Sequence, residues 1–299
     1  MIKVKGVTKY FDAFKVLDDI SLNVRRGTIY GLIGPNGAGK TTIINHINGV
    51  LTPKIGEITI NNEAVFENEA IKQTVLNISD DWFYYSTFSI KEMAKFYEDV
   101  YPNFSKERYA AISQIFKIDE KRQIRKLSKG MKKQVAFWLS LSAMPDVLIL
   151  DEPLDGLDPV MRKQVLNLVI ADVADRKMTV LVSSHNLREL EDICDWVGII
   201  HKGKMILEKP LDDLKGNVHK YQVVLTDETA VQLEEMENVL HTSKTGSVYN
   251  VIVRGDSKET DRQIKALMPV LCERVSLTLE EVFIYELGGL GYDFKNIII

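Results

Sequence analysis

The feature that most constrains this chain is a glycine-rich segment near the N-terminus, residues 34–42, with the sequence GPNGAGKTT. It follows a short apolar run, residues 28–33, and precedes apolar positions with helical spacing, so a strand ends and a helix begins here. Glycines allow the backbone to curl until several N–H groups point at one spot, and the helix N-terminus adds partial positive charge. The segment therefore predicts a binding site for a polyphosphate.

Individual residues of this loop have separate expected roles. Lys40 would place its charge against the β and γ phosphates, and the hydroxyl of Thr41 is a suitable ligand for Mg²⁺. The alternative is a glycine-rich turn with a chance Lys-Thr pair, which the preceding strand and the following helix disfavour. The residues expected to contact the phosphates are Asn36, Gly37, Ala38, Gly39, Lys40, Thr41 and Thr42.

Composition limits the class of protein. At 299 residues the chain has room for a large nucleotide-binding domain and a smaller second one. A net charge of −4 provides no overall basic field for nucleic acid, and two cysteines without a C-x-x-C companion fit a reducing cytoplasm. No run approaches the roughly 18 to 20 apolar residues of a membrane span. We therefore expect a soluble protein that can attach to a membrane partner.

The runs along the chain predict an α/β protein with additions. Strand-like runs within residues 1–33 indicate an antiparallel β layer, and helical periodicity after it indicates an inserted helical subdomain at about residues 79–145. From about residue 217, short strand and helix runs alternate, as in a small α+β domain of which the ferredoxin-like arrangement is one candidate. The expected domains are therefore residues 1–216 and 217–299.

An aromatic pair lies in what reads as a polar connection between the first strands. Phe11, with Tyr10 beside it, could stack a flat ring on adenine there. Most large aromatic residues are simply buried, so a core position is the alternative and both readings stay open.

Two adjacent carboxylates follow a later apolar run, residues 147–150, which lacks alternation and so indicates a buried parallel strand. Asp151 is placed to hold Mg²⁺ through water, and Glu152 to orient a water molecule toward the γ-phosphate. The alternative is an ordinary helix N-cap before Pro153, but two charges at the end of a buried strand are costly without a cation. His185 ends a second such strand and can reach the same phosphate, although a lone histidine is more often structural.

A second anion site is predicted at residues 127–134, where Ser128 and Gly130 open a helix. One domain cannot fold this site and the loop at residues 34–42 onto a single γ-phosphate across a helical insertion. A second copy of the domain, placed head to tail, can.

In this order the motifs resemble those of the ATP-binding subunits of ABC transporters, over about residues 2–215. The Walker A loop, the signature-like residues 127–131, the Walker B strand with Glu152, the D-loop at residues 156–158 and the switch His185 carry the resemblance. It implies an ATPase that uses ATP and Mg²⁺, a second nucleotide-binding domain and a separate multi-span membrane permease. It also implies that Phe11, with Tyr10 as the alternative, is the adenine-stacking ring and that Asp158 belongs to the nucleotide site.

Two departures from the family pattern matter. Lys129 and Met131 replace a glycine and the glutamine of the usual LSGGQ signature, a form that resembles the bacterial export-type branch. At the position of the Q-loop glutamine stands Asp80, or alternatively Asp81, whose carboxylate could bind Mg²⁺ through water. The aromatic residues 82–85 after it are expected either to dock on the permease or to pack into the helical subdomain.

The sequence thus predicts an ATP-hydrolysing subunit that powers export through a membrane permease, to which it is attached at the cytoplasmic face of the cell membrane. The alternative is a soluble ABC-type ATPase acting on ribosomes or DNA. A single set of motifs and the lack of a heptad tract favour transport. The transported substrate, and whether the second nucleotide-binding domain is another copy of this chain or a paralogue, stay open.

Overall fold

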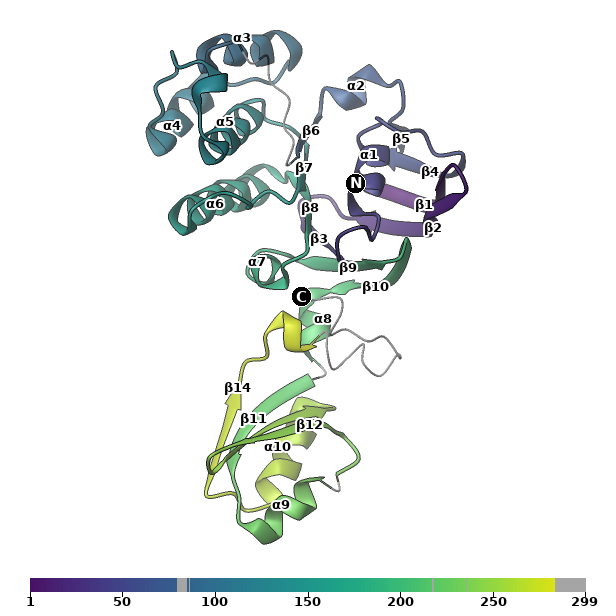
Figure 1. Cartoon of the computed structure of the whole chain (residues 1–299), viewed down its shortest axis with the longest axis vertical. Helices are drawn as coiled ribbons and strands as arrows, with labels where there is room; N and C mark the ends of the chain where they lie inside the picture. Colours follow the sequence, from purple (N-terminus) through teal and green to yellow (C-terminus); the bar gives the residue numbers. More distant parts are fainter. Residues whose placement is uncertain (80–84, 86, 217, 235, 283–299) are drawn as a thin grey trace. The chain divides into compact units, whose positions relative to one another are not determined.

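The computed structural model describes residues 1–79, 85, 87–216, 218–234 and 236–282 (Figure 1). Two compact units make up the chain. The first contains Met1–His185 and Ile193–Glu208, and the second contains Asn186–Asp192 and the chain from Lys209 onward. Asp80, Asp81 and the aromatic residues 82–84 lie outside the described residues, so the predictions made for them stay predictions.

The first unit is built on two sheets with the strand orders β2-β1-β4-β5 and β10-β9-β3-β8-β7-β6. The first sheet is antiparallel, and in the second β6, β7, β8, β3 and β9 run parallel. Its strands confirm the predicted α/β fold class with an antiparallel layer. The bounds are β1 (Ile2–Phe11), β2 (Phe14–Val24), β3 (Ile29–Ile33), β4 (Ile55–Ile60), β5 (Glu63–Ala64), β6 (Val75–Ile78), β7 (Val147–Asp151), β8 (Thr179–Ser184), β9 (Trp196–His201) and β10 (Lys204–Pro210).

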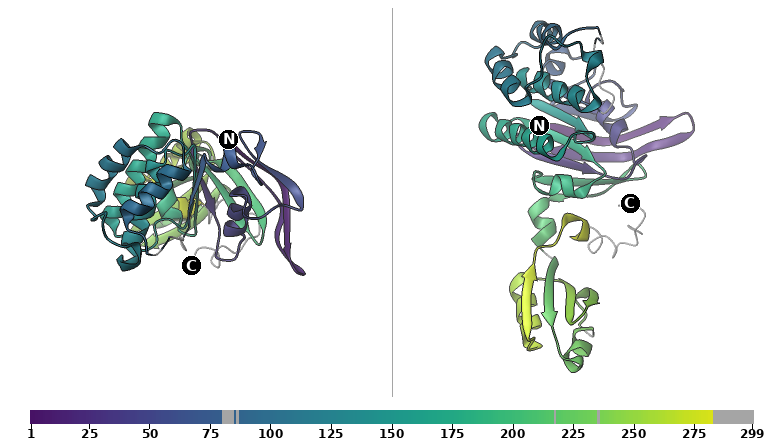
Figure 2. Two further views of the ribbon diagram at one scale, coloured as in Figure 1. Left: turned by 90° about the horizontal axis from the view of Figure 1, so that it is seen from above. Right: turned by 60° about the vertical axis from the view of Figure 1, so that its left-hand side comes forward.

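The main core lies between these sheets. Buried isoleucines of α1 (Lys40–Ile47) join buried residues of both sheets in one cluster. On the other side of the parallel sheet lie α5 (Lys129–Ser142) and α6 (Pro159–Arg176), as Figures 1 and 2 show. With both faces covered, β3, β7 and β8 are fully buried, which explains their continuous apolar runs.

The first two strands are longer than their apolar pattern indicates. They pair as far as Phe11 and Phe14, and Asp12 with a φ of 51° lies in the tight connection between them. The expectation that Phe11 lies in a polar connection was therefore wrong. Cross-strand hydrogen bonding extends both strands through polar residues, a contribution that apolar alternation does not reveal.

The helical segment consists of α3 (Ile90–Val100), α4 (Lys106–Phe116), a 3₁₀ turn (Ile124–Lys126) and α5, with the short α2 (Glu69–Lys72) before it. Tyr97 and Phe116 are buried as expected, whereas the rings of residues 96, 104 and 109 are half-buried. The Tyr109 ring stacks on the fully buried Trp138 at a centroid distance of 4.7 Å, and Trp138 Nε1 donates to the Tyr109 carbonyl at 2.8 Å. This contact joins α4 to α5.

In the second unit, a four-stranded antiparallel sheet has the order β12-β13-β11-β14. With one helix after β11 and one after β13, this is the ferredoxin-like arrangement. The sequence did not indicate β12, because its residues are mostly polar and exposed. The bounds are α7 (Leu187–Glu191), α8 (Leu211–Gly216), β11 (Val218–Val224), α9 (Asp227–Glu234), β12 (Val239–Thr245), β13 (Val248–Arg254), α10 (Ser257–Ala266) and β14 (Leu271–Val275).

The short helix α7 follows β8 in sequence but belongs to the second unit. The carboxylate of Glu191 accepts a hydrogen bond from the Leu279 backbone N–H at 3.1 Å, and Arg188 pairs with Glu280 at 3.3 Å. These contacts join residues about 90 positions apart, so no local pattern predicts them. The domain boundary at residues 216 and 217 stays a prediction.

We predict that Trp138→Ala lowers the free energy of unfolding by about 3 to 5 kcal/mol, because it leaves a cavity in a packed helix contact. Urea denaturation followed by circular dichroism measures this change. Trp138→Phe keeps a ring at the same place and should lose clearly less. Equal losses for the two variants would show that the indole hydrogen bond, and not the ring packing, dominates.

Candidate functional site

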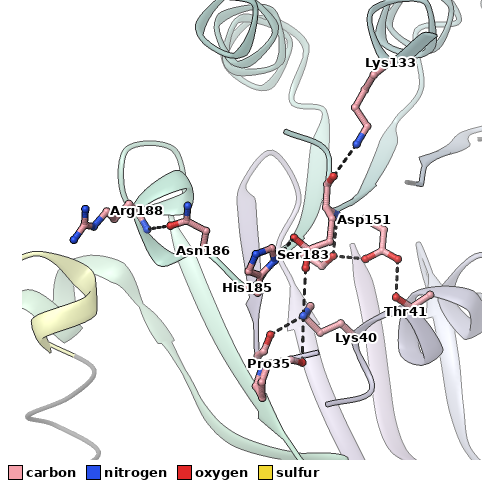
Figure 3. Close-up of polar contacts among 11 residues, drawn as sticks. Pro35, Lys40, Thr41, Lys133, Asp151, Ser183, His185, Asn186 and Arg188 are labelled. Carbon is pink, nitrogen blue, oxygen red and sulfur yellow. Dashed lines mark hydrogen bonds and ion pairs between the residues drawn. The ribbon is translucent and has the colours of Figure 1, made fainter. Parts of the chain in front are cut away.

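The loop that joins β3 to α1 wraps around Lys40. Gly39, the N-cap of α1, has a φ of 110°, and a Cβ there would approach the Leu17 side chain to 2.8 Å. Only glycine fits this position without strain. The Lys40 side chain is 6% exposed, and its Nζ donates to the Gly34 carbonyl oxygen at 2.6 Å (Figure 3). The loop thus holds an ammonium group at its centre, where the sequence placed the phosphate-binding lysine.

A buried carboxylate lies next to the loop, at the C-terminal end of β7. Asp151 Oδ2 accepts a hydrogen bond from Thr41 Oγ1 at 2.8 Å, and Oδ1 accepts one from Ser183 Oγ (Figure 3). Asp151 is 7% exposed. Hydroxyl donors from α1 and β8 therefore compensate a charge that would be costly to bury alone.

The next residue has an unusual backbone. Glu152 has a φ of 48° although it is not glycine and precedes Pro153, which restricts the residue before it. Such a conformation costs about 1 to 3 kcal/mol and persists only where the surroundings enforce it. Here the Glu152 N–H donates to the Ser183 carbonyl at 3.2 Å, and its own carbonyl accepts from Lys133 Nζ at 2.9 Å. The following helix begins only at Pro159, so the alternative of an ordinary N-cap is wrong.

The Glu152 side chain brings together the residues that the sequence singled out. Lys40 Nζ lies 3.3 Å from one carboxylate oxygen, and His185 Nδ1 lies 2.9 Å from the other. The His185 side chain, directly after β8, is 49% exposed, whereas the Glu152 side chain that it contacts is 18% exposed. Three segments far apart in sequence thus converge at one edge of the parallel sheet, where ligands bind in open α/β folds.

The signature segment lies at the start of α5. Ser128 is its N-cap and accepts from the Met131 N–H at 3.2 Å. A Cβ on Gly130 would approach the Gly156 carbonyl oxygen to 2.8 Å, so the absent side chain lets α5 contact the D-loop closely. Asp158 caps α6 by accepting from two backbone N–H groups at 3.0 and 3.1 Å. Both Ser128 and Asp158 are exposed. Their cap hydrogen bonds are made within their own helices and, in the described part of the chain, do not involve Lys40 or Glu152.

The aromatic pair expected near adenine lies at the tip of the β1–β2 hairpin. Tyr10 and Phe11 are each 47% exposed, so the alternative of a core position is wrong. Lys9 lies over the Phe11 ring at 5.1 Å and Lys15 over the Tyr10 ring at 5.6 Å. An exposed ring is available for stacking, and the adenine contact itself stays a prediction.

Two residues of the site were not predicted from the sequence. Ser183 lies at the end of the apolar run before His185, and a hydroxyl at the end of a buried apolar run is a usable signal for such a site residue. Lys133 belongs to the run Lys132-Lys133, which reads as a solvated helix face, yet its side chain is 5% exposed. Its direction depends on tertiary packing that the sequence does not reveal.

Comparison with known proteins identifies the family. A family model described as "ABC transporter" matches residues 17–155. The chain is 30% identical to the ABC transporter ATP-binding protein YtrB of Bacillus subtilis over 97% of this chain and 99% of that one. It is 35% identical to the bacitracin transport ATP-binding protein BcrA of Bacillus licheniformis, over 81% of this chain and 80% of that one. A solved structure of an ATP-binding subunit of an ABC transporter matches with a TM-score of 0.68 at 29% identity, covering 72% of this chain and 92% of that one.

The chain belongs to the ABC transporter ATP-binding proteins. It is accordingly an ATPase that binds ATP, and the predicted function as the ATP-hydrolysing subunit of an export-type transporter is confirmed at the level of the family. None of the relatives named here supports the alternative of an ATPase acting on ribosomes or DNA.

We predict that Ser183→Ala lowers kcat for ATP hydrolysis about tenfold or more, because a hydrogen bond to a charged group contributes about 1.5 to 3 kcal/mol. Steady-state phosphate release measures the change. Ser142→Ala is a matched control, since Ser142 is equally buried but donates to the Trp138 carbonyl on α5. A similar loss in both variants would indicate a general loss of folded protein instead.

Proposed function

We propose that this chain hydrolyses Mg-ATP at sites formed head to tail with a second nucleotide-binding domain, and that it thereby powers export through a multi-span permease. The observation that carries the proposal is the convergence of Lys40, Glu152 and His185 beside the pair formed by Thr41 and Asp151. These are a cation for phosphate, a carboxylate for water, a hydrogen-bonding histidine and oxygen ligands for a metal ion.

The residues present fit Mg²⁺. The Thr41 hydroxyl and the Asp151 carboxylate are oxygen ligands 2.8 Å apart, and Mg²⁺ prefers oxygen. No group of three or more acidic, histidine or cysteine side chains that could hold a metal occurs in the described residues. That fits Mg²⁺, which is commonly held by one or two carboxylates together with the phosphates of the substrate. When bound, the ion would neutralise phosphate charge. Asp80, outside the described residues, stays a predicted further ligand through water.

In hydrolysis, Lys40 would exchange its contact with Glu152 for the β and γ phosphates, leaving the carboxylate to orient the attacking water. The distance of 3.3 Å between Lys40 Nζ and the Glu152 carboxylate supports this, because both groups already lie at the same place in the site. His185, 2.9 Å from the same carboxylate, would hydrogen-bond the γ-phosphate and keep Glu152 in place. Loop N–H groups from Asn36 to Thr42 would surround the phosphates, and Phe11 would stack on adenine.

Completion of each site by a second domain is supported by the exposure of the signature segment. Ser128 and Gly130 open α5 at the surface, and neighbouring Asp158 is exposed as well. A hydroxyl and a helix N-terminus suit a phosphate supplied from outside this chain. The second domain is either another copy of this chain or a paralogue.

The proposed partner and location are supported by the relatives of this chain. The chain would attach to the cytoplasmic face of the membrane through the permease, as an ATP-binding subunit of a transporter. None of its helices in the described part is both long and apolar enough to cross a bilayer. The relative named for bacitracin transport supports a peptide antibiotic as the class of cargo. The second domain, residues 217–299, would support dimerisation or regulation and supply no catalytic group.

We predict that Glu152→Gln retains ATP binding but loses roughly two or more orders of magnitude in turnover, because positioning the water stabilises the transition state. Light scattering should then detect a dimer trapped by Mg-ATP. Glu107→Gln, an exposed change on α4, is the control and should turn over normally. Near-wild-type hydrolysis by Glu152→Gln would contradict the assigned role.

We further predict that Ser128 acts on the nucleotide of the partner subunit. Lys40→Ala and Ser128→Arg should each be inactive alone. In a mixed dimer, one site carries both changes and the other is intact, so partial ATPase activity should reappear on mixing. If heterodimers form and stay inactive, the head-to-tail arrangement or the independence of the two sites is wrong.

A further inference from the structure

The side chain of Lys133 leaves the lysine-rich surface of α5 and turns inward. Its exposure is 5%, and its Nζ donates to the Glu152 carbonyl oxygen at 2.9 Å (Figure 3). Lysine is almost never fully buried unless it is paired, because its ammonium group loses hydration. The hydrogen bond to the Glu152 carbonyl therefore places a buried ammonium group directly against the backbone of the site.

That carbonyl belongs to the residue with the left-handed backbone. The N–H of Glu152 is held from β8 by Ser183, and its carboxylate is held by Lys40 and His185. Lys133 holds the remaining polar group, the carbonyl, from α5. Because φ and ψ set the direction in which a side chain leaves the backbone and restrict its rotamers, fixing both peptide groups limits where the Glu152 carboxylate can lie.

The same helix carries the signature segment. Ser128 caps its first turn, and Gly130 lies close to the Gly156 carbonyl, where a Cβ would approach to 2.8 Å. Lys133 follows Ser128 by five positions, less than two turns along a continuous helix. Thus α5 contacts both ends of the loop from Glu152 to Gly156, and any displacement at its N-terminus reaches that loop directly.

We propose that Lys133 is a positioning residue for the reaction, which orients Glu152 from the signature helix. The inference rests on the proposed function, in which Glu152 orients the water and Ser128 faces the nucleotide of the partner subunit. The hydrogen bond from Lys133 then links the two sites of the dimer. The N-terminus of α5 contacts the nucleotide bound by the partner subunit, and Lys133 on the same helix orients Glu152 of its own chain.

The test compares Lys133→Met, Lys133→Arg and, as a matched control, Lys163→Met on the exposed face of α6, each in the wild-type and in the Glu152→Gln background. Methionine retains an unbranched stem and removes the ammonium group, which is both the donor and the charge. The full-length chain is assayed for kcat and KM of ATP hydrolysis, for binding of a fluorescent ATP analogue, and for its thermal midpoint.

We expect Lys133→Met to lower kcat about 10- to 100-fold, as a small misplacement of a catalytic group does, while analogue binding changes less than about twofold. Lys133→Arg, which keeps a donor, should recover part of kcat. In the Glu152→Gln background Lys133→Met should cause no further loss, because its effect passes through the carboxylate.

Three results would overturn the proposal. They are an unchanged kcat in Lys133→Met, an equal loss in both backgrounds, or a loss of analogue binding and of thermal midpoint in proportion to kcat. A Glu152→Gln chain that hydrolyses ATP normally would refute the proposed function itself. That failure is visible in the Glu152→Gln chain alone, without any change at Lys133.

Discussion

Two adjacent carboxylates at the end of a fully buried strand are the constraint on which the rest of this structure depends. A buried strand gains stability from apolar contact on both faces, whereas charges at its end lose hydration. Asp151 is compensated by hydroxyls of Thr41 and Ser183, and Glu152 by Lys40 and His185. The phosphate loop and the ends of β7 and β8 are therefore held together, and the contacts that satisfy these charges also assemble the residues of the site.

The same arrangement supports the exchange of partners that we propose for nucleotide binding. Lys40 and Glu152 are 3.3 Å apart without the alignment of a hydrogen bond, and within the described residues the Glu152 oxygen nearest Lys40 has no hydrogen-bond partner. An imperfect ion pair of this kind is cheaper to exchange than a well-formed one. In the proposed reaction, phosphate oxygens would offer Lys40 a stronger partner, and the carboxylate would become available to water.

Helix α5 contacts two parts of the protein, the helical segment and the loop after β7. Its middle packs into the helical segment through Trp138, and its first turns contact the loop after β7 through Gly130 and Lys133. Because a helix is stiff over this length, packing of the helical segment and geometry of the site are coupled. The ferredoxin-like unit is held separately, by its own sheet and by the contact of Glu191 with the Leu279 backbone.

The sequence alone determined the α/β class, the phosphate loop, the carboxylate pair and His185, because each follows a local pattern of glycines or of an apolar run ending in polar residues. It did not determine that β1 and β2 continue to Phe11 and Phe14, that α7 joins the second unit, or that Lys133 turns inward. Those outcomes depend on hydrogen bonds and packing between residues far apart in the chain. Only the tertiary structure decides them, since a lysine on a helix is solvated or buried according to what lies opposite it.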